Sequence, residues 1–354
     1  MTPGPARRVR GRLIPTFLCM ISAMIVGACT PTPVRTGPDF VSPALDQNFP
    51  DPSILATYET NPVTGVASKV WYAFATEGAG ARIQMARSTD LLHWNLAGEA
   101  LPIPPAWADP RLTWAPSVIA AGGEFRLYYS IINASNGEHC VSVARSATLK
   151  GPFVDTSAGP VACTPPGEGS IDPSPYVDGA GTPWLVWSTE GNVSRSRVIL
   201  GGRLDPTGTY VLPGTEATIL TGSTNWESKI IEAPHFIQAY GKLWLFYSGG
   251  DWKSSKYSIG VAQCDSPRGP CTRSFDLPLL QTRGAMKGPG GPHLVVDANG
   301  DTFLAFHAWS GTIGYSAGGR RSMYLLTVYF EDGEPKLGGS PSAVPVTAPT
   351  SLAP

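Results

Sequence analysis

The sequence predicts an all-β protein, a five-bladed β-propeller with antiparallel blades around a central channel. Composition is the first reason, because Gly 40 and Pro 35 together make up about a fifth of the 354 residues. Glycine adds backbone entropy and proline removes a hydrogen-bond donor, so long helices tolerate this composition badly. The aromatic residues (Trp 10, Tyr 12 and Phe 12) suit short strands.

The second reason is an internal repeat of about 60 residues. Five segments begin with a polar or small residue and a proline and continue as a strand, at spacings of 64, 57, 61 and 58 residues. A second, aromatic strand and a third strand follow each of them. The first strands are expected at 51–55, 115–119, 172–176, 233–237 and 291–295, the second at 71–74, 125–129, 184–187, 244–247 and 303–306, and the third at 83–86, 141–144, 198–200, 259–262 and 323–328.

One blade cannot bury both faces of its sheet, whereas five blades in a ring can, so the repeat predicts radial packing. A β-helix would need far shorter repeats, and a sandwich would not repeat at this period. The first strand of each blade lines the channel of a propeller. The residues at the starts of these strands should therefore converge on one mouth of the channel.

The N-terminal segment is interpreted as a targeting signal. The chain begins with a basic stretch that contains four arginines. A mostly apolar stretch follows and ends in small residues directly before Cys29. This pattern predicts a bacterial lipoprotein signal peptide at residues 1–28 and lipidation of Cys29. A plain secretory signal and an uncleaved anchor are the alternatives. We expect an exported protein, secreted or held at the cell surface, that meets the membrane only through a lipid anchor at Cys29.

The rest of the chain divides into three parts. Residues 29–45 are expected to form a linker, residues 46–330 the propeller, and residues 331–354 a partly flexible end rich in Pro, Ala, Ser and Thr. Four cysteines follow Cys29, and an even number in an exported protein suggests two disulfides. Pairing between sequence neighbours is the simplest arrangement, Cys140 with Cys163 and Cys264 with Cys271.

Three acidic residues occupy matched places in the repeats. Asp51 and Asp172 directly precede the proline of repeats one and three, and Glu232 lies two residues before the proline of repeat four. Ala115 and Gly291 stand at the equivalent places of repeats two and five, where small side chains leave room for a ligand. An aspartate before proline can also cap a turn, and this structural role is the alternative explanation for each acid taken alone. Three acids at matched positions favour a function at the channel mouth.

Paired carboxyl groups in a sugar-sized pocket suit the cleavage of glycosides. One acid must stay protonated to donate to the leaving oxygen, and another must be ionised to activate water. A third acid can raise the pKa of the donor through like-charge repulsion. Phe49, Trp94, Trp114 and Trp309 could stack on sugars near the mouth, although core packing is the alternative for each. The formal net charge of −1 gives no support for a nucleic-acid partner.

Several short motifs, in order and at blade spacing, resemble those of glycoside hydrolase family 43, a family of five-bladed propellers that are mostly arabinofuranosidases, arabinanases and xylosidases. The resemblance covers about residues 46–330. The motifs are Phe49-Pro50-Asp51-Pro52-Ser53, Ser88-Thr89-Asp90-Leu91-Leu92-His93-Trp94, Trp114-Ala115-Pro116-Ser117-Val118, Ile171-Asp172-Pro173-Ser174, Ile231-Glu232-Ala233-Pro234, Phe306-His307-Ala308-Trp309 and Gly319-Arg320-Arg321-Ser322-Met323.

The resemblance implies a role for each matching acid. Asp51 matches the general base, Glu232 the general acid, and Asp172 the acid that tunes the pKa and orients the donor. Because the family inverts configuration, water should attack opposite the leaving group. One of Arg320 and Arg321 matches an arginine near the substrate, and we favour Arg321.

The resemblance implies that the protein requires no cofactor. A structural calcium ion in the channel is one expectation. His307 matches a channel histidine that in many members of the family supports a central metal ion, often calcium, through water. A packed histidine without a metal is the alternative. We expect the protein to be a monomer that acts on an oligosaccharide or polysaccharide.

The leading hypothesis is an inverting hydrolase that removes terminal α-L-arabinofuranosyl residues from arabinan or related cell-wall polysaccharides. The same fold and mechanism acting on β-xylosides or galactofuranosides, or as an endo-arabinanase, is the first alternative. A retaining fructan-type hydrolase usually carries Arg-Asp-Pro in its middle blade, whereas Ile171 precedes Asp172 here. A sugar-binding propeller without catalysis is a further alternative, and the presence of all three acids counts against it.

Overall fold

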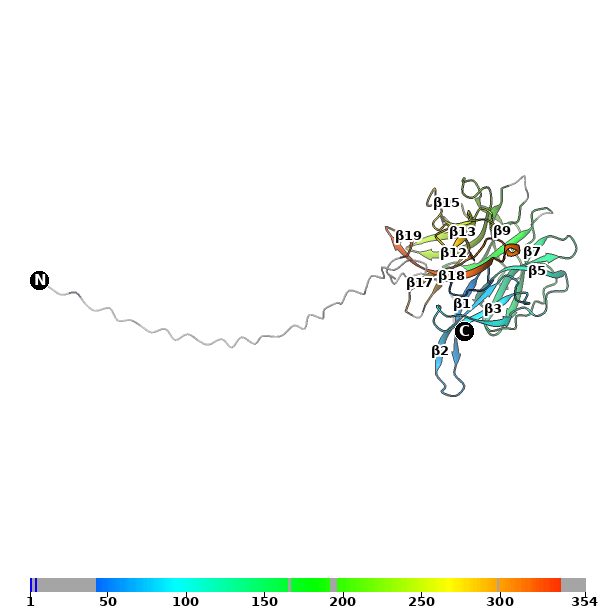
Figure 1. Cartoon of the computed structure of the whole chain (residues 1–354), viewed down its shortest axis with the longest axis horizontal. Coiled ribbons are helices and arrows are strands. Elements are labelled where there is room, and N and C mark those ends of the chain that lie inside the picture. Colours follow the sequence, from blue (N-terminus) through cyan, green and yellow to red (C-terminus); the bar gives the residue numbers. More distant parts are fainter. Residues whose placement is uncertain (2–3, 5–42, 165–166, 192–195, 298, 339–354) are drawn as a thin grey trace. The chain divides into compact units, whose positions relative to one another are not determined.

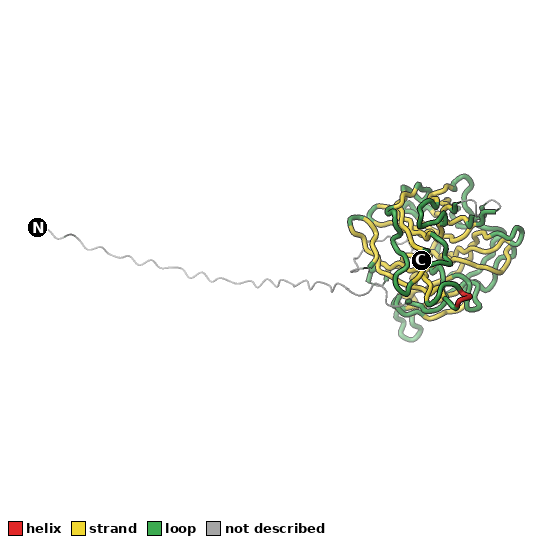
Figure 2. The backbone as a smooth tube through the Cα atoms, turned by 45° about the horizontal axis from the view of Figure 1, so that its top comes forward, coloured by secondary structure: helices red, strands yellow, loops and turns green. Residues whose placement is uncertain are grey.

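The computed structural model describes Met1, Gly4 and residues 43–164, 167–191, 196–297 and 299–338. Cys29, the predicted lipidation site, lies outside these residues, as do nearly all of the predicted signal peptide and most of both the linker and the C-terminal end. Within the described part, no helix is long and apolar enough to cross a membrane. The described chain is almost entirely strand and loop, with a single short 3₁₀-helix, η1 (Tyr315–Ala317) (Figure 2).

Five antiparallel sheets form the five blades, and in each sheet the strands follow one another in chain order (Figure 1). Four sheets have four strands and the second has three. Blade one holds β1 (Ser53–Thr60), β2 (Ala67–Ala75), β3 (Gln84–Ser88) and β4 (Asn95–Glu99), and blade two holds β5 (Ala108–Ala121), β6 (Glu124–Asn133) and β7 (His139–Ser146). Blade three holds β8 (Ser170–Val177), β9 (Pro183–Thr189), β10 (Val198–Arg203) and β11 (Ala217–Thr221). Blade four holds β12 (Ile231–Ala239), β13 (Lys242–Gly249), β14 (Ser258–Cys264) and β15 (Cys271–Arg273), and blade five holds β16 (Lys287–Val296), β17 (Thr302–Ser310), β18 (Arg320–Glu331) and β19 (Glu334–Leu337).

The first strand of each blade contacts the first strands of both neighbouring blades, so β1, β5, β8, β12 and β16 form a closed inner ring. Five clusters of buried hydrophobic side chains lie between successive blades and hold the ring together. The aromatic second strands supply the largest of these side chains, including Trp71, Trp187 and Trp244, which are almost fully buried. The predicted five-bladed propeller is confirmed.

Residues that precede β1 close the ring against blade five. The N–H of Leu45 donates to the carbonyl of Met323 at 3.2 Å, and the N–H of Phe49 donates to the carbonyl of Arg321 at 2.8 Å. Both partners lie in the first half of β18, whereas β19 pairs with the second half of that strand. The outer edge of blade five is thus shared between the two ends of the folded chain.

Both predicted disulfides are present. Cys140 in β7 is bonded to Cys163, and Cys264 in β14 is bonded to Cys271 in β15. Each therefore joins sequence neighbours within one part of the ring.

Candidate active site

The residue before the proline has a left-handed backbone in all five blades. The φ angles are 56° at Asp51, 43° at Ala115, 55° at Asp172, 52° at Ala233 and 66° at Gly291. Side chains with a Cβ rarely adopt this conformation, and each such residue costs about 1–3 kcal/mol. The first strands of blades two to five also shift register at this point. A β-bulge re-aims the side chains at a strand start, and here it directs them toward the channel mouth.

Side chains on the second strands, or directly after them, stabilise this strained backbone. These side chains occupy equivalent places in the five blades. In each blade the residue after the proline pairs with a residue of the second strand, and the side chain in question follows two residues later in the chain. The five residues are Thr76, Ser130, Ser188, Ser248 and His307. Four of them accept the N–H of the left-handed residue in the next blade around the ring, at 2.8–3.1 Å. At Ala233 the acceptor is instead the carboxyl group of Asp172, at 2.9 Å.

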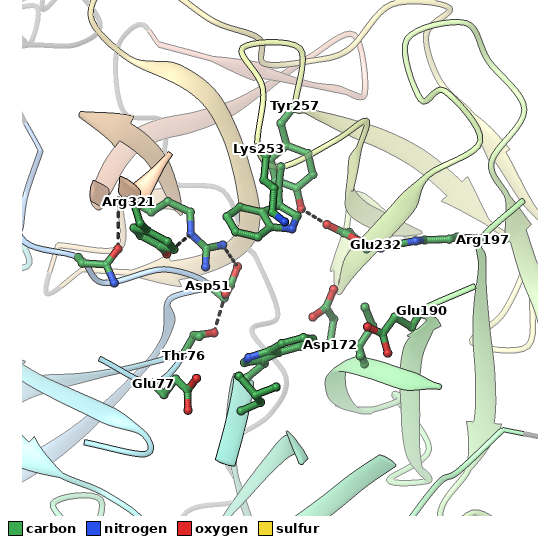
Figure 3. A pocket seen from close by; sticks show the side chains of 16 residues that line it. Asp51, Thr76, Glu77, Asp172, Glu190, Arg197, Glu232, Lys253, Tyr257 and Arg321 are labelled. Carbon is green, nitrogen blue, oxygen red and sulfur yellow. Dashed lines mark hydrogen bonds and ion pairs between the residues drawn. The ribbon is translucent and has the colours of Figure 1, made fainter. Parts of the chain in front are cut away.

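A cavity of about 590 Å³ lies over these strand starts, a volume typical of small-ligand sites. Asp51, Asp172 and Glu232 all line it, as the sequence predicts, and so do Trp114 and Arg321 (Figure 3). Figure 3 shows the three carboxyl groups on different sides of one space. The structure therefore brings together acids that are more than 180 residues apart in the chain.

Asp51 is held as a carboxylate. Its Oδ2 accepts a 2.6 Å hydrogen bond from the Thr76 hydroxyl, and its Oδ1 lies 3.1 Å from Nδ1 of His307 and 3.6 Å from a guanidinium nitrogen of Arg321. Burial alone raises the pKa of Asp51, but the positive charge of Arg321, the contact with His307 and the hydrogen bond from Thr76 lower it below the usual range of an aspartate. Asp51 can therefore accept a proton from water.

The other two acids have the opposite tendency. Burial raises the pKa of Asp172 well above its usual value, and the negative charges of Glu232 and Asp51 raise it further. Burial also raises the pKa of Glu232, more than Arg197 and the Tyr257 hydroxyl lower it. Both carboxyl groups therefore hold a proton more strongly than an exposed acid does. The cavity thus combines one acid that ionises readily with two that tend to stay protonated.

Glu232 is oriented by two residues that the sequence analysis did not select. The hydroxyl of Tyr257 donates to Oε1 at 2.7 Å, and Arg197 forms a close ion pair with Oε2. Gly290 makes room for Tyr257, since a Cβ there would lie 1.8 Å from the tyrosine ring. Neither Tyr257 nor Arg197 belongs to a repeated motif, which is why the repeat did not reveal them.

Arg321 belongs to a wall of stacked side chains. Its guanidinium lies 4.5 Å from the centre of the Trp252 ring and 5.7 Å from that of Tyr315. Its Nε donates to the Tyr315 hydroxyl at 2.8 Å. Trp252, Lys253 and Tyr315 line the cavity, and all three were missed because they lie between strands, outside the repeated motifs. Arg320, the alternative to Arg321, instead pairs with Asp46 at the ring closure.

Three predicted sugar-stacking aromatics do not line the cavity. Phe49 and Trp309 have exposed fractions of 0%, and Trp94 is buried as well. Phe49 and Trp94 pack in the core between blades five and one. Trp309 lies behind the wall, stacked 6.0 Å from Trp252 and donating to its carbonyl at 2.8 Å. The expectation that these three rings contact a sugar directly is corrected, because neighbouring residues bury all three.

His307 contacts Asp51 as described, and its Nε2 is buried without a hydrogen-bond partner among the described residues. The same is true of Nε2 of His235 in the channel. In the described part of the chain, no three His, Cys, Asp or Glu residues gather in a way that could hold a metal ion. Calcium takes six to eight oxygen ligands, and these side chains do not supply them directly. The predicted calcium ion stays a prediction.

Comparison with known proteins gives a family and several relatives. The sequence profile described as glycosyl hydrolases family 43 matches residues 40–335. An extracellular endo-α-(1→5)-L-arabinanase of Thermotoga petrophila is 27% identical over 256 residues, covering 62% of this chain and 50% of the relative. The chain thus spans half the length of that protein. An extracellular exo-α-(1→5)-L-arabinofuranosidase of Cellvibrio japonicus is 24% identical over 281 residues, covering 72% and 80%.

Solved structures are similar over most of the chain. A thermostable family-43 glycoside hydrolase has a TM-score of 0.72 and 26% identity, covering 86% of this chain and 97% of the other. An endo-1,4-β-xylanase from Bacteroides thetaiotaomicron has a TM-score of 0.68 and 27% identity, covering 85% and 97%.

Proposed function

Because the chain belongs to glycosyl hydrolases family 43, we propose that it hydrolyses α-L-arabinofuranosyl linkages of arabinan or related cell-wall polysaccharides, with inversion, and releases terminal residues. One observation carries the chemistry: an ionised Asp51 and a proton-retaining Asp172–Glu232 pair line the same cavity. The arabinan substrate is supported by the printed activities of the Thermotoga petrophila and Cellvibrio japonicus relatives.

The proposed reaction is a single displacement. The Asp51 carboxylate accepts a proton from a water molecule while the water oxygen bonds to the anomeric carbon. The bond from that carbon to the glycosidic oxygen breaks, and Glu232 gives its proton to the departing oxygen. Arg197 and Tyr257 hold the Glu232 carboxyl toward the cavity, and Asp172 restrains the adjacent Ala233. Arg321 keeps Asp51 ionised until the proton arrives.

Internal cleavage is the second candidate. The Thermotoga petrophila relative and a Bacillus subtilis relative, 24% identical over 260 residues, are both named endo-arabinanases. Both names also include the word extracellular, which supports the export that the N-terminal sequence predicts.

The test is hydrolysis of linear α-1,5-arabinan and of a panel of aryl arabinofuranosides, xylosides and galactofuranosides. We expect arabinose from arabinan, with the β-anomer appearing first in the NMR spectrum, and loss of the activity in Glu232→Gln. A ladder of oligosaccharides would select internal cleavage. An initial α-anomer would overturn inversion, and activity on the xyloside or galactofuranoside alone would overturn the substrate. Binding of arabinan without any hydrolysis would indicate a sugar-binding protein.

A further inference from the structure

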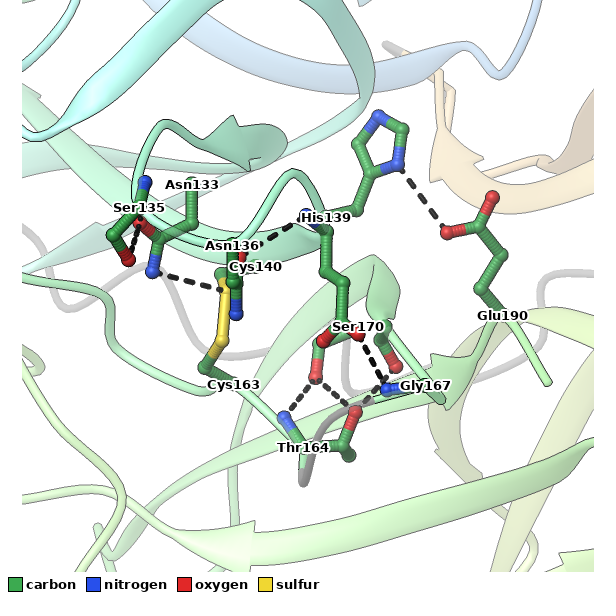
Figure 4. Close-up of a disulfide and its surroundings, with 12 residues drawn as sticks. Asn133, Ser135, Asn136, His139, Cys140, Cys163, Thr164, Gly167, Ser170 and Glu190 are labelled. Carbon is green, nitrogen blue, oxygen red and sulfur yellow. Dashed lines mark hydrogen bonds and ion pairs between the residues drawn. A yellow bond between two sulfur atoms is a disulfide. The ribbon is translucent and has the colours of Figure 1, made fainter.

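A second ring lies behind Trp114 in the cavity wall. The indole of Trp114 stacks on the imidazole of His139, with ring centres 3.8 Å apart and an angle of 27° between the planes. Trp114 is half-buried and lines the cavity, whereas the His139 side chain has an exposed fraction of 6%. His139 is the first residue of β7 and precedes the disulfide-bonded Cys140 (Figure 4).

Both ring nitrogens of His139 face acceptors. Nε2 lies 3.2 Å from the carbonyl oxygen of Leu112, which can only accept, so Nε2 carries a hydrogen. Nδ1 lies 3.3 Å from Oε2 of Glu190 (Figure 4). The hydrogen bond with His139 lowers the pKa of Glu190, more than burial raises it, and the charges of His139 and Arg197 lower it further. Both nitrogens of the ring are thus held by protein groups, one from the same blade and one from blade three.

The imidazole, held at both nitrogens, stacks on the indole. Aromatic rings in such an arrangement attract each other. The charged groups that face the ring are Glu190, which follows β9 of blade three, and Arg197 beyond it. The neighbouring Glu138 accepts the N–H of Gly167 instead. The support of Trp114 therefore spans the junction of blades two and three.

The place of Trp114 in the repeat explains why its support matters. Trp114, Ile171 and Glu232 each lie two residues before the proline of their blade, and all three line the cavity. The indole thus stands at the same level of the cavity as the general acid. Lateral movement of this ring would change how a sugar is held there without altering the acids.

We propose that His139 is a positioning residue that, held between Glu190 and the Leu112 carbonyl, fixes Trp114 as a sugar-stacking platform. This deepens the proposed function and rests on it for the identity of the sugar. His139 touches no reacting atom in this arrangement, so it sets substrate affinity and leaves the chemical step unchanged.

The kinetic test compares His139→Gln with His139→Arg on arabinan. We expect KM to rise roughly tenfold in His139→Gln with kcat nearly unchanged. We expect His139→Arg to restore much of the affinity, because arginine also stacks on tryptophan and pairs with a carboxylate. His93→Gln is the matched control, because His93 pairs with Asp90 in the same way but is exposed. An unchanged KM, or an equal loss of kcat in both His139 variants, would overturn the proposal.

A second measurement does not depend on activity. The chain has 5 histidines, so side-chain ¹⁵N NMR of the full chain can resolve them, and His139 is identified by its absence in His139→Gln. We expect Nε2 of His139 to carry a hydrogen that exchanges slowly with solvent, because the ring is buried against the Leu112 carbonyl. A ring without a hydrogen on Nε2 would contradict the proposal even if arabinan is hydrolysed. A protected hydrogen on Nε2 in a protein that hydrolyses no arabinan would leave the stack intact and refute only the proposed function.

Discussion

The carboxyl group of Asp172 accepts the backbone N–H of Ala233 at 2.9 Å, where the other four blades use a side chain from the second strand of the preceding blade. Asp172 thereby fixes the residue next to Glu232. Ser188 stands at the place that would otherwise supply the acceptor, and among the described residues its hydroxyl has no partner. In this blade, an acid of the cavity thus provides the hydrogen bond that a second-strand side chain provides elsewhere, directly beside Glu232.

Replacing Asp172 by asparagine separates its two roles. In Asp172→Asn the side-chain oxygen can still accept the Ala233 N–H, but the coupled titration with Glu232 is lost. Glu232 then loses its proton at lower pH, so the alkaline limb of the pH–rate profile should move to lower pH, with a fall in kcat on the order of 10²-fold. Asp172→Ala, which also breaks the hydrogen bond, should lose more. An alkaline limb that stays in place would contradict the coupling.

The serines of the second strands give a matched pair for stability. Ser248→Ala removes the acceptor of the Gly291 N–H and leaves a buried donor unsatisfied, which should lower the free energy of unfolding by about 1–3 kcal/mol. Ser188→Ala removes a hydroxyl that has no partner in the described part of the chain and should change it by less than about 0.5 kcal/mol. Guanidinium unfolding of both variants measures the difference. Equal losses would show that the hydrogen bond to Gly291 is not the cause.

Thr76 is expected to set the acid limit of activity. Its hydroxyl donates to Asp51 and accepts the N–H of Ala115. The bond to Asp51 is one of the interactions that lower the pKa of that carboxyl. In Thr76→Val the pKa of Asp51 should rise, and the acidic limb of kcat/KM should move up by about one pH unit. Thr76→Ser keeps the hydroxyl and should leave the limb where it is.

Arg197 is expected to set the position of the alkaline limb of the pH–rate profile. Its positive charge lowers the pKa of Glu232, so its removal in Arg197→Gln should raise that pKa. The general acid works when protonated, and the alkaline limb should therefore move to higher pH, by about one unit. Arg197→Lys retains the charge and provides the control. A shift to lower pH in Arg197→Gln would contradict the ion pair as the cause.

Much of the fold was predictable because proline and aromatic residues mark every blade in the same order. The repeat also placed Asp51, Asp172 and Glu232 correctly, since a strand start has a fixed place in a propeller. The loops carry no such regularity, and Trp252 could not be inferred from it. The place of Trp309 in the sequence led to the wrong expectation that it contacts the sugar, because neighbouring residues of a strand face opposite sides of the sheet. The left-handed backbone at Ala115 was also hidden, because residues before proline ordinarily prefer extended conformations.

The closure of the ring determines at which point of synthesis the residues of the cavity can come together. Asp51 precedes the first strand, while its partners His307 and Arg321 lie in the last blade. A nascent chain therefore carries Asp51 long before its partners in blade five have been synthesised. The Leu45 and Phe49 hydrogen bonds to β18 join the parts of the propeller that are made first and last. The surroundings of Asp51 are consequently complete only when the final blade packs against the first.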